Sequence, residues 1–153
     1  MNRAYRFRIY PTGEQEILIH KTFGCCRFVY NHMLADKKQA YEETKKTIKI
    51  TPASYKKEYP WLKEVDSLAL ANEQLHLERA YRKFFRESKT GFPKFKSKHG
   101  NRKSYTTNVV NGNIRISEGR LRLPKVGTVK MRQHREIPAG WILKSVTVSM
   151  EPS

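Results

Sequence analysis

The chain has 153 residues, of which 38% are hydrophobic, and its 31 Lys or Arg against 14 Asp or Glu give a formal net charge of +17. This length suits one compact domain or two small lobes, and the charge favours a polyanionic partner such as nucleic acid. A membrane surface fits less well, because no segment is basic on one face and strongly apolar on the other, and no apolar run approaches the roughly 20 residues of a span. The N-terminus lacks a signal-peptide core and the only cysteines, Cys25 and Cys26, are adjacent, which favours the reducing cytoplasm.

The first part of the chain predicts a strand followed by helix. Residues 4–10 alternate between apolar and polar side chains, which is the period of a half-buried strand, and Pro11 ends it. Thr12 and Gln15 fit a capping box at a helix start. Apolar stripes continue to about residue 46, and Gly24 within them marks a break or a close helix contact.

The middle of the chain predicts turns and then a long helix. Residues 45–62 combine two prolines with mixed polarity, which is typical of a loop or short turns. The next helix is capped by Asp66 or Ser67 and is ended by Gly91 and Pro93. Its apolar positions at roughly 3.6-residue spacing are Leu70, Leu77, Tyr81 and Phe84.

The last third of the chain has the period of strands. The alternating segments are 113–117, 120–124, 128–132 and 142–150. With the first strand they predict an α+β fold, a small antiparallel β-barrel or sheet with a helical lobe inserted after the first strand. The expected segments are a first barrel strand 1–11, a helical lobe 12–90, a basic linker 91–107 and the remaining barrel strands 108–153. A strand that stops at the chain end predicts an open edge, as in a fragment or half of a larger assembly.

No catalytic or metal site is expected in this chain. A two-metal nuclease needs several converging carboxylates, whereas the only two aspartates, Asp36 and Asp66, suit a solvated helix face and a helix cap. Cys25 and Cys26 lack the spacing of zinc ligands, and small buried hydrophobes are the better interpretation.

Basic and aromatic residues are interleaved in segment 92–107, which contains no acid. Lys and Arg neutralise phosphates, and planar rings stack on unpaired bases. The alternative is a solvated linker. We expect Phe92 and Phe95 to pack inward while Lys94, Lys96 and Lys98 alternate outward.

The strands also carry cations at alternate positions, which predicts a basic sheet face. An ordinary polar face is the alternative, and the excess of one sign favours a polyanion-binding surface. The paired positions are Arg6 with Arg8, Arg120 with Arg122, and Lys130 with Arg132.

Several stretches together resemble one family. YRFRIYPTGEQEILIHKTFGCCRFVYNHML resembles the N-terminus of the transposon-encoded TnpB (OrfB) proteins, which are relatives of the compact type V CRISPR effectors. WLKEVDSLALANEQLHLERAYRKFFR resembles their long helix and GFPKFKSKHGNRKSYTT the segment after it. GRLRLPKVGTVKMRQHR and KSVTVSMEPS resemble their barrel strands. The resemblance implies a wedge-type barrel interrupted by a helical recognition lobe, and RNA-guided cleavage of DNA beside a short transposon-adjacent motif.

The resemblance assigns cleavage to a following RuvC-like domain with acidic Mg²⁺ ligands, and no position of this chain matches it. We therefore expect no cofactor and no cleavage by this polypeptide alone. The expected partners are guide RNA and double-stranded target DNA, in the nucleoid-associated part of a prokaryotic cytoplasm. The alternatives are a stand-alone DNA-binding regulator derived from TnpB and a subunit that docks onto a separate RuvC nuclease chain.

The resemblance also suggests contact residues. The candidates for DNA contacts are Ser54, Tyr55, Ser67, Asn72 and Asn111. The candidates for contacts to RNA and to the guide–target duplex are Arg6, Arg8, Lys94, Lys96, Lys98, Arg102 and Lys103.

Overall fold

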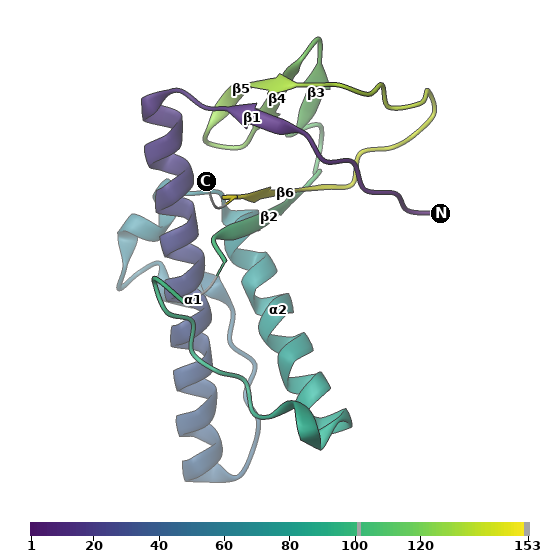
Figure 1. Ribbon diagram of the computed structural model, residues 1–153. Helices are drawn as coiled ribbons and strands as arrows, with labels where there is room; N and C mark the ends of the chain where they lie inside the picture. Colours follow the sequence, from purple (N-terminus) through teal and green to yellow (C-terminus); the bar gives the residue numbers. More distant parts are fainter. Residues whose placement is uncertain (101, 152–153) are drawn as a thin grey trace.

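Two long helices carry two small antiparallel sheets at one end of the molecule in the computed structural model, which describes residues 1–100 and 102–151 (Figure 1). The helices are α1 (Gly13–Thr44) and α2 (Ser67–Arg86). Three short 3₁₀ helices are η1 (Pro52–Tyr55), η2 (Pro60–Glu64) and η3 (Ser88–Thr90). The α+β class expected from the sequence is confirmed.

The larger sheet has four strands in the order β1-β5-β4-β3, and every neighbouring pair is antiparallel. Its strands are β1 (Arg8–Tyr10), β3 (Arg115–Ser117), β4 (Arg120–Leu123) and β5 (Gly127–Arg132). The second sheet is a two-stranded ladder of β2 (Ser104–Asn108) and β6 (Ser145–Ser149). All four late strands expected from the sequence are present.

The expected closed barrel is not formed by the described residues. The strands make two separate ladders, and segment 133–144 crosses from the larger sheet to the smaller one. The basic linker expected at 91–107 is also shorter than predicted, because its last four residues begin β2. Residues 152 and 153, where we expected the chain to leave its last strand at an open edge, lie outside the described residues.

Helix α1 is a single helix of 32 residues, so the break considered at Gly24 is wrong. The capping box is confirmed, since the Thr12 hydroxyl accepts from the Gln15 backbone N–H and the Gln15 side chain accepts from the Thr12 N–H. A glycine inside a helix costs about 1 kcal/mol. Burial of Val29, Met33 and other residues along the helix outweighs that cost.

Helix α2 lies beside α1, inclined to it, and packs beneath β2 (Figure 1). Asp66 caps it as expected: one carboxylate oxygen accepts from the Leu68 N–H at 2.9 Å and the other from the Thr107 hydroxyl of β2. The core between the two helices and the sheets includes Leu70 and Leu77, both fully buried.

The solvated role expected for Asp36 is wrong. Its carboxylate accepts a hydrogen bond from the buried Tyr55 hydroxyl of η1, which ties η1 to α1. Burial and this hydrogen bond raise the pKa of Tyr55.

Candidate nucleic-acid interface

One face of the four-stranded sheet is covered by cations. Alternation along each strand places apolar side chains such as Leu121 and Val129 in the core and leaves the intervening residues in solvent. The exposed cations on this surface, here called the cationic sheet face, are Arg8, Arg115, Arg120, Arg122, Lys130 and Arg132. The other outward positions are Tyr10, Ser117 and Thr128, so none is acidic.

The strand register sets these cations directly against one another. Arg8 lies opposite Arg132, and Lys130 lies opposite Arg120. Like charges in direct cross-strand positions destabilise a sheet by roughly 0.2–1 kcal/mol per pair. None of the six cations takes part in an ion pair found among the described residues. A polyanion on this face would relieve the repulsion.

The predicted basic sheet face is therefore confirmed, with two changes. Arg6 precedes β1 and donates to Glu151 at 2.8 Å. Arg102 reaches the same Glu151 oxygen at 3.2 Å, so Glu151 bridges the two arginines at an exposed site. Arg115 completes the face, and its signal was its alternation with Ile114 and Ile116.

A second basic surface lies between α1 and the segment before β2. It is a cavity of about 410 Å³, open to solvent, where Lys98 and Lys103 meet Lys21 and Arg27 of α1. Lys21 is ion-paired with Glu64, and the other three cations take part in none of the ion pairs found among the described residues.

This cavity, here called the basic groove, is also lined by Gly24 of α1, which has no side chain. A Cβ placed on Gly24 would meet nothing within 4 Å, so the helix backbone is open to approach there. Lys21 and Arg27 carried no sequence signal of their own, because only the tertiary fold brings them to the predicted lysines.

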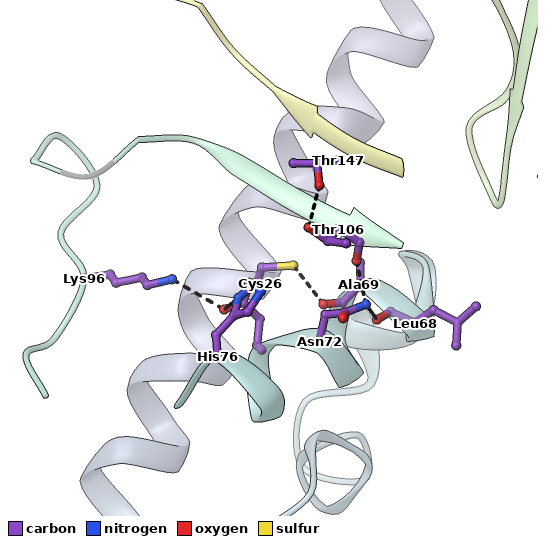
Figure 2. Close-up of polar contacts among 9 residues, drawn as sticks. Cys26, Leu68, Ala69, Asn72, His76, Lys96, Thr106 and Thr147 are labelled. Carbon is purple, nitrogen blue, oxygen red and sulfur yellow. Dashed lines mark hydrogen bonds and ion pairs between the residues drawn. The ribbon is translucent and has the colours of Figure 1, made fainter. Parts of the chain in front are cut away.

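Lys96 points inward, so the expectation that all three lysines of the linker alternate outward is wrong. Its ammonium lies 3.5 Å from a carboxylate oxygen of Glu73 and 4.3 Å from the centre of the Tyr30 ring. The Glu73 side chain is 3% exposed, and His76 lies 3.5 Å from the same oxygen. Figure 2 shows Lys96 reaching from its own segment toward α2, which carries His76. Lys94 and Lys98 are exposed, as expected.

The two phenylalanines of the linker are not packed in the core, which corrects the expectation that they point inward. Phe92 is 39% exposed and Phe95 is 51% exposed. The Lys38 ammonium lies close to both rings, at 5.5 Å from the centre of Phe92 and 5.4 Å from that of Phe95.

The DNA candidates differ in what their side chains already contact. Asn72 is 7% exposed, and its amide donates to the Thr106 carbonyl at 2.9 Å and to the Asn108 side chain at 2.6 Å, as well as to Leu68 (Figure 2). Tyr55 is buried against Asp36. These two side chains hold the fold together, and their contacts to DNA remain predictions.

The other three DNA candidates lie on the surface. Ser67 is exposed at the first position of α2, and the Ser54 hydroxyl donates to the Thr51 carbonyl at 2.6 Å. Asn111 is exposed at the tip of a turn, where it and Gly112 both have positive φ. Asn113 closes this turn and donates to the Asn108 carbonyl, so the turn is coupled to the asparagines beneath it.

Two further features bear on function. Among the described residues, none of the helices is long and apolar enough to cross a membrane. No group of three or more His, Cys, Asp or Glu side chains in residues 1–100 and 102–151 could hold a metal ion.

Basic α+β proteins whose cations gather on one acid-free face are typical nucleic-acid binders. Comparison with known families agrees with this class. A helix-turn-helix domain model of the OrfB IS605 type matches residues 1–46. All of those residues are described, and they form β1 and the whole of one continuous helix, α1, rather than two helices joined by a turn.

Three curated relatives are similar to this chain. "Putative RNA-guided DNA endonuclease InsQ" of Escherichia coli (strain K12) is 34% identical over 96% of this chain. A Streptomyces pristinaespiralis protein named "Putative RNA-guided DNA endonuclease" is 32% identical over 99% of it. "Virulence protein VsdF" of Salmonella dublin is 40% identical over 65% of this chain and 97% of its own length.

The chain belongs to the TnpB/OrfB family, and two of these relatives are named as putative RNA-guided DNA endonucleases. It spans 37% and 39% of the length of the two relatives that are named as endonucleases.

Proposed function

We propose that this chain is the recognition portion of a TnpB-like RNA-guided DNA endonuclease. It binds guide RNA and reads the transposon-adjacent motif of double-stranded target DNA. One observation carries the proposal: six cations lie on a single acid-free sheet face, in a register that opposes like charges. Family membership specifies the polyanions that we expect on this surface, namely guide RNA and target DNA.

The two basic surfaces have the chemistry that such a role requires. In a guided system base pairing selects the sequence, so the protein needs to recognise only backbone and shape. Arginines on a rigid sheet present planar forks to phosphates with little loss of entropy. The basic groove beside α1 adds a second line of cations, three of which are free of ion pairs among the described residues.

Reading of the adjacent motif is proposed for the end of the molecule where α2 begins. Ser67 is exposed at the first position of α2, and Asn111 is exposed on the nearby turn. The Asn113 side chain of that turn donates to the Asn108 carbonyl, and the Asn108 side chain accepts from Asn72. Hydroxyl and amide groups can bond both base edges and phosphates.

We propose that cleavage is carried out by a RuvC-type domain with its own Mg²⁺ ligands and not by these residues. A stand-alone DNA-binding regulator is the second candidate. It is favoured by the Salmonella dublin relative, because 97% of that protein matches about two thirds of this chain, so a protein that consists almost wholly of part of this portion exists.

The proposal is tested by purifying the tagged chain from its host and sequencing the RNA that co-purifies. DNA binding is then measured with and without that RNA, on duplexes with a randomised flank beside a matched target. We expect one discrete RNA and DNA binding that depends on it. RNA-independent binding to a defined duplex would instead establish the regulator, and binding to neither nucleic acid would refute both candidates.

A further inference from the structure

The C-terminal end of α2 points away from both sheets (Figure 1), and five aromatic side chains belong to this end and to the segment that follows it. The rings, here called the aromatic end cluster, are Tyr81, Phe84 and Phe85 of α2 with Phe92 and Phe95 of the segment that follows. The rings of Tyr81 and Phe92 meet edge to face at 5.4 Å, and those of Phe84 and Phe92 at 5.3 Å. Phe85 stacks beside Tyr81 at 6.3 Å.

This cluster leaves large apolar rings in solvent. Phe85 is 68% exposed and Phe95 is 51% exposed, whereas Tyr105 and Phe23 in the core are 2% and 7% exposed. A contiguous apolar surface on a soluble domain marks a binding site more often than isolated exposed residues do. Ring–ring contacts link four of the five rings, and Phe95 is joined to Phe92 through the Lys38 ammonium, which lies within 5.5 Å of both ring centres.

Cations are built into the same platform. The Lys37 ammonium lies 5.4 Å from the centre of the Tyr81 ring, and the Lys38 ammonium lies within 5.5 Å of two rings of the cluster. The one acid in an ion pair at this end, Glu87, lies 3.8 Å from Arg86 among the described residues. Rings interleaved with positive charge suit a ligand that is itself both flat and anionic.

Unpaired nucleotides meet both conditions. Each base has a π-face that stacks on an aromatic ring whatever its sequence, and each phosphate carries a negative charge. A protein partner would not require the lysines, and a duplex would not offer its base faces.

We propose that the aromatic end cluster binds single-stranded nucleic acid by stacking unpaired bases on Phe85 and Phe95, with Lys38 beside the phosphates. This deepens the proposed function and rests on it, because it assigns the unpaired part of a guide or displaced strand to the end of the molecule opposite the cationic sheet face. Sequence specificity is not expected, since stacking does not read base edges.

The test compares ring with non-ring side chains on the purified full chain. Binding is measured to a fluorescent single strand of about 12 nucleotides, as RNA and as DNA, and to a duplex of the same length. A strand of about 12 nucleotides falls within the site sizes of typical single-strand binders. The variant Phe85→Leu, Phe95→Leu keeps the apolar character and loses the rings, and Phe85→Tyr, Phe95→Tyr keeps the rings. The matched surface control is Trp141→Leu, Ile142→Ala, since Trp141 and Ile142 are exposed elsewhere.

We expect the Leu variant to lose roughly tenfold or more in single-strand affinity, while its duplex affinity changes less than about twofold. The Tyr variant and the surface control should bind like the unmodified chain. The RNA and DNA arms decide which strand is preferred, and stacking predicts binding of either.

Three results would overturn the proposal. The Leu variant could bind single strands normally, or it could lose single-strand and duplex binding equally. Concentration-dependent self-association that the Leu variant abolishes would make the cluster an interface between two copies of this chain. Failure of the proposed function itself is distinct, because then neither single strand nor duplex binds to the unmodified chain.

Discussion

Removing charge from the centre of the cationic sheet face should weaken nucleic-acid binding while strengthening the fold. The variant is Arg120→Gln, Arg122→Gln, Lys130→Gln, which keeps most of the side-chain length and removes three of the six cations. Lys130 lies opposite Arg120 in the register and Arg122 lies opposite Arg115, so two direct like-charge pairs disappear.

The magnitude follows from the number of phosphates that the variant no longer neutralises. Each neutralised phosphate contributes about 0.9 to the slope of log affinity against log salt for duplex DNA, so three give a decrease of roughly 2.7. The factor by which affinity falls between about 50 and 200 mM salt should therefore be roughly 40-fold smaller in the variant. Removal of the two opposed pairs should raise the free energy of unfolding by about 0.4–2 kcal/mol.

The assay is fluorescence anisotropy with a duplex probe across a salt series, together with urea unfolding. The control is Lys45→Gln, Lys46→Gln, Lys49→Gln, which removes the same charge from exposed residues at the far end of α1. An unchanged slope in the sheet variant, or an equal decrease in the control, would show that the sheet face does not contact the phosphates.

Three further predictions concern side chains whose role the tertiary structure changed or defined. Lys96→Gln leaves the buried Glu73 carboxylate without its ammonium partner, so the free energy of unfolding in urea should fall by about 1–2 kcal/mol, a range that allows for the partial exposure of Lys96. The salt dependence of nucleic-acid affinity should not change. A weaker salt dependence at unchanged stability would instead place Lys96 on nucleic acid. Burial raises the pKa of Tyr105 in the folded protein. The neutral phenol therefore contributes fully to the free energy of unfolding below the unfolded pKa of about 10, and this contribution is lost as the pH rises above that value. Tyr105→Phe should therefore lose about 1.4 kcal/mol less than the unmodified chain between about pH 8 and pH 11, and equal losses would contradict the assignment. Asn72→Ala removes a buried donor and should cost about 1–3 kcal/mol in urea unfolding, whereas Ser67→Ala at an exposed site should change stability by less than about 0.5 kcal/mol; equal effects would show that the Asn72 hydrogen bonds are not structural.

Local pattern determined much of this protein. Alternation of charge and apolar side chains was enough to place Arg120, Arg122 and Lys130 on one solvent face, because successive residues of a strand point to opposite sides. The caps at Thr12 and Asp66 were likewise readable, since a cap depends on residues within one turn of the helix.

Contacts between distant segments were decided only by the tertiary structure. Lys96 alternates with outward lysines in the sequence, yet it turns inward because Glu73, 23 residues earlier, lies buried beside it. Asn72 looked free to contact DNA until β2, 34 residues later, supplied acceptors for its amide. The chain encodes local periodicity residue by residue, but the partner of a buried polar group depends on how whole elements pack. For the same reason the sequence predicted the four late strands and did not show that they form two separate sheets rather than one closed barrel.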